Sequence, residues 1–132
     1  MPKISDQQLL NLAKKARKNA AAKHTGFAVG AAILSKSGKA YTGVNVESDI
    51  PSLSQCADRA ALINALGAGE REFKALAIVT ETKKCFPCGA CRQLLAEFCG
   101  FDLKVISANA QGTHHEILKL ADLLPHPYVM ER

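Results

Sequence analysis

The chain has 132 residues, of which 48% are hydrophobic and 22% charged, and this predicts one globular domain over residues 1–132. It has no apolar run of the roughly 18 residues that a membrane helix needs and no apolar segment at its start, so we expect a cytoplasmic protein without a membrane partner. The net charge of +5 comes from dispersed basic residues without interleaved aromatic side chains, which argues against a nucleic-acid partner.

The first half of the sequence predicts a helix followed by a hairpin. Ser5 can cap a helix in which apolar residues recur at helical spacing. Residues 27–34 predict a buried strand, residues 35–39 contain Gly38 and predict a turn, and residues 40–46 predict the partner strand. Residues 47–54 predict an irregular loop.

The second half alternates helices with strands. Helices are predicted over residues 55–66 and 88–99, each followed by glycine. Strands are predicted over residues 74–80 and 103–108, and a last short strand and helix run through residue 124. This alternation after an opening hairpin predicts an α/β layered domain with a mixed sheet.

Three cysteines have the spacing of metal ligands. Cys56 and the pair Cys88-x-x-Cys91 each fall where the chain enters a predicted helix, and free N–H groups there stabilise a thiolate. Five cysteines cannot pair completely, and clustered cysteines in a cytoplasmic chain indicate a metal or catalysis. Three protein ligands plus water are typical of catalytic zinc. Cys85 and Cys99 are interpreted as ordinary thiols, the first at the end of a strand and the second at the close of a helix.

Other interpretations of the cysteines explain less of the sequence. A redox pair at Cys88 and Cys91 leaves Cys56 without a role, and a structural zinc site needs a fourth protein ligand. An iron–sulfur run that includes Cys85 requires a fourth cysteine followed by proline, whereas Cys99 is followed by glycine.

An acid lies two residues after the first ligand. Zinc-dependent base deaminases carry a proton-transferring Glu at this position, and here it is Asp58. Three thiolates and one Zn²⁺ leave a net negative charge, which Arg59 and Arg92 can offset by bonding to sulfur. The alternative for both arginines is an exposed helix face.

The chain resembles the small, homotetrameric, zinc-dependent cytidine deaminases over nearly its whole length. The resemblance is carried by Phe-Ala-Val-Gly-Ala-Ala from position 27, Thr-Gly-Val-Asn-Val-Glu from 42, Cys-Ala-Asp-Arg-Ala-Ala from 56, Arg-Glu-Phe-Lys-Ala-Leu-Ala-Ile from 71, Pro-Cys-Gly-Ala-Cys-Arg-Gln from 87 and Leu-Leu-Pro from 123. It implies a three-layer α/β/α fold with a mixed five-stranded sheet, one zinc ion per chain and a homotetramer.

The resemblance also implies a role for each matching residue. Cys56, Cys88 and Cys91 would bind zinc, and Asp58 stands where the family has its proton-shuttling Glu. The substrate contacts that it implies are the Phe27 ring on the base and ribose, Asn45 and Glu47 on the ribose hydroxyls, the Ala57 backbone on the pyrimidine, the Phe86 carbonyl on the leaving amine, and Tyr128 in a neighbouring subunit's pocket. Without the resemblance, core packing is the simpler interpretation of Phe27 and Tyr128.

The sequence departs from the family pattern at three places. Asp58 replaces Glu, the loop of residues 48–52 lacks the usual Asn and Tyr, and Phe86 replaces Ser or Thr. The implied function is hydrolytic deamination of cytidine or deoxycytidine in pyrimidine salvage. The alternatives are a deaminase of a modified pyrimidine nucleoside (isocytidine, an N4-substituted cytidine or a blasticidin-like compound), a non-catalytic nucleoside-binding relative, and a nucleic-acid-binding protein with structural zinc, against which the cysteine first ligand and dispersed charge argue.

Overall fold

Five strands form one mixed sheet in the order β2-β1-β3-β4-β5 in the computed structural model, which describes residues 3–82 and 85–131. Strands β3 and β4 are parallel, and every other neighbouring pair is antiparallel. The strands are β1 (Gly30–Ser35), β2 (Ala40–Val44), β3 (Phe73–Thr80), β4 (Lys104–Asn109) and β5 (His115–Lys119).

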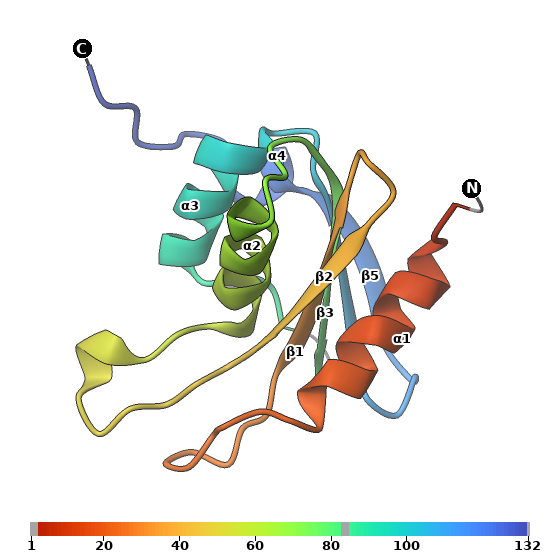
Figure 1. Ribbon diagram of the computed structural model, residues 1–132, viewed down its shortest axis with the longest axis vertical. Coiled ribbons are helices and arrows are strands. Elements are labelled where there is room, and N and C mark those ends of the chain that lie inside the picture. Colours follow the sequence, from red (N-terminus) through yellow and green to blue (C-terminus); the bar gives the residue numbers. More distant parts are fainter. Residues whose placement is uncertain (1–2, 83–84, 132) are drawn as a thin grey trace.

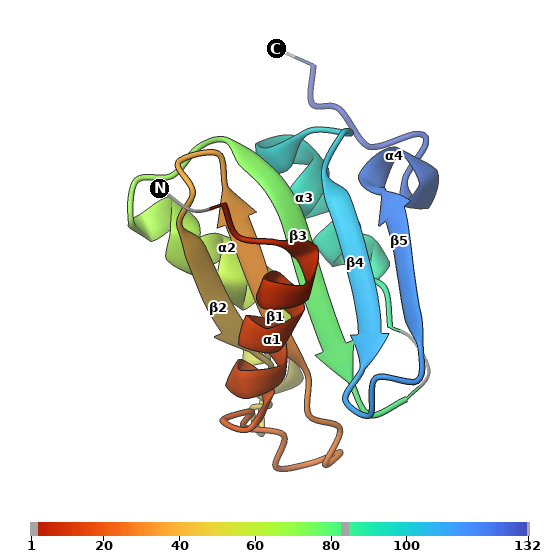
Figure 2. The ribbon, with the colours of Figure 1, turned by 90° about the vertical axis from the view of Figure 1, so that its right-hand side faces the viewer.

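Helices cover both faces of this sheet. One face carries α1 (Asp6–Arg17), and the other carries α2 (Ala57–Gly67), α3 (Gly89–Cys99) and the short α4 (Leu120–Leu123) (Figures 1 and 2). The loop between β2 and α2 contains a short 3-10 turn, Pro51–Leu53. The expected three-layer α/β/α architecture with a mixed five-stranded sheet is confirmed. Within the described ranges, none of the helices combines the length and the apolarity needed to cross a bilayer.

The central strands are buried on both faces, so alternate side chains feed two separate cores. Ile33, Leu76 and Val105 point toward α2 and α3, whereas Leu34, Ala77 and Ile106 point toward α1. Small and aliphatic side chains fill both cores, and Phe73 is the one aromatic among their buried members in the described residues. A strand buried on both faces reads as a continuous apolar run, which is why residues 74–80 were recognisable in the sequence.

The first strand begins later than the sequence predicts. The expected strand starts at residue 27, but β1 starts at Gly30, and the Asn45 side chain bonds to the backbone of the residues before it. Asn45 accepts from the Val29 N–H at 2.9 Å through Oδ1 and donates to the Phe27 carbonyl at 2.8 Å through Nδ2. The amide of Asn45 thus takes the place of a strand partner for the Val29 N–H and the Phe27 carbonyl.

A close approach between β2 and α2 fixes the start of that helix. A Cβ at Gly43 would collide with the backbone carbonyl of Ala57 and the backbone nitrogen of Ala61. Only glycine therefore allows α2 to lie directly on the edge strand. The first turn of α2 is the part of the helix that carries the sequence motif Cys-Ala-Asp.

Candidate metal centre and active site

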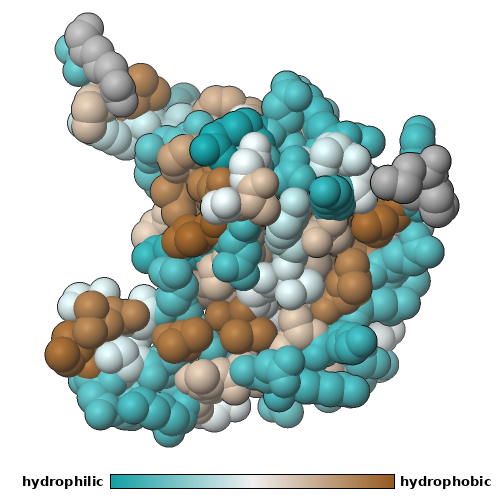
Figure 3. All heavy atoms as spheres, viewed as in Figure 1, coloured by the Kyte–Doolittle hydropathy of each residue, from teal (hydrophilic) through white to brown (hydrophobic). Residues whose placement is uncertain are grey.

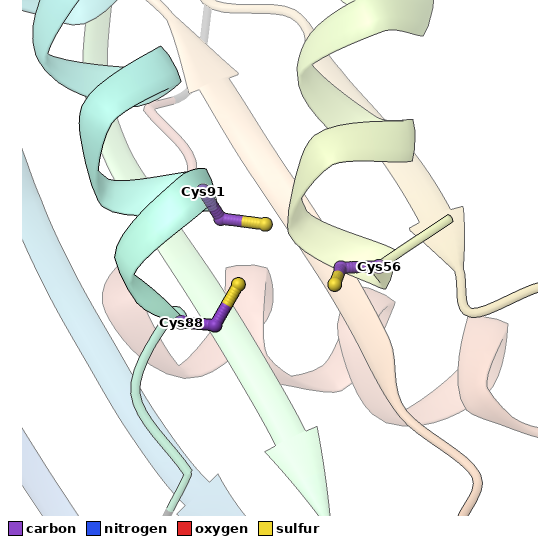
Figure 4. Close-up of side chains that lie close together, drawn as sticks. All are labelled: Cys56, Cys88 and Cys91. Atoms are coloured by element: carbon purple, nitrogen blue, oxygen red, sulfur yellow. The ribbon is translucent and has the colours of Figure 1, made fainter. Parts of the chain in front are cut away.

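Three cysteine sulfurs converge between the beginnings of two helices. Cys56 directly precedes α2, Cys88 directly precedes α3, and Cys91 lies in the first turn of α3. Their sulfur atoms all lie within 4.8 Å of one another (Figure 4). One ion with metal–sulfur bonds of about 2.3 Å can contact all three. The predicted ligand cluster is therefore assembled by the fold.

The cluster favours a cation even without a metal. A hydrogen bond from the Cys91 thiol, opposed by burial, lowers the pKa of Cys56 to about 6. The same shared proton, together with burial, raises the pKa of Cys91. All three cysteines lie at helix N-termini, where the positive end of the helix dipole stabilises a thiolate.

Asp58 lies in the first turn of α2 and is only 5% exposed. Burial raises the pKa of its carboxyl group, and hydrogen bonds from Cys91 and from nearby backbone oppose that shift. Its Oδ2 atom is buried and has no hydrogen-bond partner among the described residues. Buried polar atoms are nearly always paired, so this oxygen is ready for a group that joins the site. Three sulfurs beside an unpaired carboxyl oxygen fit a catalytic zinc ion and its water.

The two arginines that were expected to bond to sulfur behave differently. Arg59 Nη2 lies 3.9 Å from Cys91 Sγ, so this arginine does contact the cluster. Arg92 instead donates from Nε to the Pro87 carbonyl at 2.6 Å and from Nη1 to the Leu123 carbonyl at 2.9 Å. The prediction that Arg92 bonds to sulfur is therefore wrong. The Arg92 guanidinium instead connects the residues just before α3 to the end of α4.

A cavity of about 460 Å³ opens beside the cluster. This size is typical of small-molecule sites. The cavity brings together most of the residues that the sequence singled out, namely Phe27, Asn45, Glu47, Cys56, Ala57, Asp58, Phe86 and Cys88. Their segments come from both halves of the chain, so the fold and not sequence proximity creates this grouping.

Glu47 is tied down at the rim of the cavity. Its carboxylate accepts from the backbone N–H groups of His24 and Thr25, both at 2.9 Å, and from the Thr25 hydroxyl at 2.6 Å. These bonds from Thr25 lower the pKa of Glu47, so it is a fixed anion. The Thr25 hydroxyl also accepts from the Phe27 N–H at 3.0 Å and thereby links Glu47 to the backbone of Phe27.

Tyr128 does not line the cavity of its own chain. The residue is 68% exposed, which excludes the core-packing interpretation. The backbone of Tyr128 exchanges two hydrogen bonds with the Gln93 side chain on α3, each 2.9 Å long. Phe27, by contrast, is half-buried against the cavity.

Several residues of the cavity wall were missed by sequence reasoning, among them Val29, Ile78 and Cys85. Val29 and Ile78 lie on the face of the sheet that packs against α2, and strand alternation could have identified them. Cys85 was interpreted as the end of a strand, but β3 ends at Thr80 and Cys85 lies in the irregular segment that borders the cavity. Its sulfur lies 3.7 Å from the Phe86 carbonyl, and burial raises its pKa.

Three cysteines at two helix N-termini, an acid in the first turn of α2 and a nucleoside-sized cavity define the zinc-dependent deaminase class. Residues 3–107 match the cytidine and deoxycytidylate deaminase zinc-binding region. A cytidine deaminase of Sporosarcina psychrophila is 41% identical over 95% of this chain and 92% of its own. The chain belongs to the cytidine deaminase family.

Solved structures agree with this assignment. The crystal structure of cytidine deaminase from Burkholderia pseudomallei has a TM-score of 0.90 and 41% identity, and the match covers 94% of this chain and 99% of the other. A more distant relative is a blasticidin-S deaminase of Bacillus cereus, 27% identical over 72% of this chain and 74% of its own length.

Proposed function

We propose that the protein is a zinc-dependent nucleoside deaminase that hydrolyses cytidine or deoxycytidine to uridine or deoxyuridine and ammonia. The observation that carries this proposal is the joint placement of three sulfurs within 4.8 Å and the unpaired carboxyl oxygen of Asp58 on one cavity. Family membership supports the same reaction. Bound zinc would be held by Cys56, Cys88 and Cys91, and it supplies a Lewis-acid centre that makes water nucleophilic near neutral pH.

Asp58 is the proton carrier of the proposed mechanism. It takes a proton from the water that attacks C4, delivers a proton to N3 and then protonates the departing amine. Its burial supports this role, because a raised carboxyl pKa makes the protonated acid easier to form near neutral pH. The net reaction adds one water and releases one ammonia.

Backbone groups on the two sides of the cluster orient the base. The Phe86 carbonyl accepts a hydrogen bond from the 4-amino group and so directs it away from the ring. The backbone of Ala57, at the free N-terminal end of α2, contacts the pyrimidine. The ring of Phe27 lies against the base and ribose. Each of these residues borders the cavity, which supports the assignment.

Asn45 and Glu47 hold the ribose hydroxyl groups in this proposal. Asn45 Nδ2 carries two donor hydrogens, and the Phe27 carbonyl accepts one of them, so the other can serve a ligand. Glu47 is held as an anion by Thr25, and its oxygens can accept from two neighbouring hydroxyl groups. Both side chains are fixed before substrate arrives, which lowers the entropic cost of binding.

A second candidate is the deamination of a modified pyrimidine nucleoside. The unpaired oxygen of the shorter Asp58 favours it, because a retracted carboxylate leaves space beside the base. The likeness to a blasticidin-S deaminase also supports it. If no nucleoside is turned over, the remaining candidate is a non-catalytic nucleoside-binding protein.

Ammonia release from a nucleoside panel tests the proposal. The panel contains cytidine, deoxycytidine, isocytidine, N4-methylcytidine and blasticidin S, each with the zinc-loaded protein and with an Asp58→Ala control. Turnover of cytidine or deoxycytidine above the other compounds supports the leading candidate. Preference for a modified compound supports the second candidate, and binding without turnover of any compound contradicts both.

The rest of the proposal concerns the assembly and its location. We propose that residues 1–132 form one domain, that four copies associate, that the protein acts in the cytoplasm and that nucleic acid is not its partner. Exposed apolar side chains support association: they gather on the loop around Pro51–Leu53 and on α3 with the C-terminal segment (Figure 3). They include Ile50, Leu53, Phe98, Phe101, Tyr128, Val129 and Met130. Light scattering at micromolar concentration tests the tetramer, and a fully active monomer would contradict it.

A further inference from the structure

The Phe86 peptide lies just before α3, outside the strands and helices of the described ranges. Residues 85–88 belong to neither kind of element, yet all four border the cavity. This segment carries Cys88 of the metal cluster and the Phe86 carbonyl, which the proposed function assigns to the departing amine. The direction of that carbonyl therefore depends on contacts from elsewhere in the fold.

One buried hydroxyl group holds the first residue of this segment. The Oγ of Ser107 accepts from the Cys85 N–H at 2.9 Å and donates to the Cys85 carbonyl at 2.9 Å. Ser107 is 0% exposed and lies in β4, in parallel register with Ile78 of β3. A rigid central strand thus fixes both polar backbone groups of Cys85.

The residue that follows Phe86 is also fixed. Arg92 Nε donates to the Pro87 carbonyl at 2.6 Å, and the Cys85 sulfur lies 3.7 Å from the Phe86 carbonyl oxygen. The Phe86 peptide is therefore held between two anchored neighbours. Of the two anchors, Ser107 is the one that does not come from the helix carrying Cys91.

We propose that Ser107 is a positioning residue for deamination: its hydroxyl group fixes Cys85 and so aims the Phe86 carbonyl at the departing amine. The inference rests on the proposed function. Ser107 is buried and does not border the cavity, so it touches no substrate. Its removal should impair the step in which the amine leaves and should spare binding of a ligand without that amine.

The experiment compares Ser107→Ala with the wild type in the zinc-loaded enzyme. For cytidine, kcat should fall by about 10- to 10²-fold, since two hydrogen bonds that place a reacting contact are lost. Competitive inhibition by pyrimidin-2-one ribonucleoside, which keeps the ring and ribose but lacks the 4-amino group, should be unchanged. Ser107→Thr retains the hydroxyl and should recover most of the loss.

Ser35→Ala is the matched control. Ser35 is 2% exposed and its hydroxyl is bonded to Glu70 and to the Glu72 carbonyl, but it lies at the other end of β1 from the cavity. This control removes an equally buried hydroxyl and should not change kcat for cytidine. Ser107→Cys, with a weaker hydrogen-bonding group, replaces Ser107→Ala if the latter does not fold, and it should show a smaller loss of the same selective kind.

The outcomes separate this inference from the proposed function. If the wild type does not release ammonia from cytidine, the proposed function fails regardless of Ser107. If the wild type is active but Ser107→Ala keeps full kcat, or loses cytidine turnover and inhibitor binding equally, the inference alone is overturned. Hydrogen exchange of residues 85–91 gives a readout independent of activity: faster exchange in Ser107→Ala supports the anchor, and unchanged exchange overturns it.

Discussion

Lengthening the acid of the site by one methylene is the most informative perturbation. Asp58 is 5% exposed, its Oδ2 has no hydrogen-bond partner within the described ranges, and it borders a cavity of about 460 Å³ that can receive a longer side chain. Asp58→Glu advances the carboxylate by about one C–C bond, ~1.5 Å. A misplacement of about 1 Å can cost on the order of 10²-fold in rate, or about 2.7 kcal/mol of barrier. We expect kcat for cytidine to rise by about that factor.

The gain should appear in kcat with little change in KM, because the carboxylate acts on protons in the transition state and the ribose contacts are untouched. Ammonia release at saturating cytidine measures it, with zinc content determined on the same sample. Asp58→Ala is the control and should lose turnover while it keeps zinc. An equal or lower kcat in Asp58→Glu at equal zinc content would refute the reasoning, and it would favour a pocket reshaped for another base.

Three further predictions concern the metal, the acid and the ribose. Cys88→Ser should lose most bound zinc and Cys85→Ser should retain it, as measured by elemental analysis; equal loss would place Cys85 among the ligands. In the metal-free protein, burial raises the pKa of Asp58, so the folded state is more stable when this acid is protonated. The contribution of Asp58 to the free energy of unfolding is therefore lost as pH rises through its folded-state pKa. Asp58→Asn should therefore raise Tm near pH 7, and a gain that persists below pH ~4, where the unfolded acid is also protonated, would contradict this. Thr25→Val should raise KM for cytidine more than it lowers kcat, because it removes the hydroxyl bond that holds one oxygen of the Glu47 carboxylate; an unchanged KM would show that Glu47 does not need this anchor.

The sequence predicted the metal cluster because its signal is local. Cys88 and Cys91 are one helical turn apart, and Cys56 precedes an apolar helix in the same manner, so both positions follow from helix boundaries. The sheet was predictable for a related reason, since strands such as β3 are buried on both faces and appear as apolar runs. The resemblance added the strand count and the layer order, which periodicity does not supply.

Three of the misses involve side chains that bond to the backbone of another segment. The strand predicted from residue 27 begins at Gly30, and the Asn45 side chain bonds to the backbone of residues 27 and 29. The apolar pattern of residues 27–34 contains no signal for these bonds. Arg92 was expected on sulfur but bonds to carbonyls, one of which belongs to Leu123 at the far end of the chain. The anchoring of Cys85 by Ser107 has no sequence signal either, because it depends on which strand lies beneath the segment.

The three cysteines come from the N-termini of two helices, so a bound ion would cross-link α2 and α3 in addition to its catalytic role. In the sequence, α2 and β3 lie between Cys56 and Cys88. An ion that binds both cysteines therefore closes a long loop of the chain (Figure 4). The entropic cost of closing a loop rises only slowly with the number of residues in it. A single ion can therefore close a loop of this length at a modest cost in chain entropy. Removal of zinc should therefore loosen α2 and α3 before it affects α1 on the opposite face of the sheet.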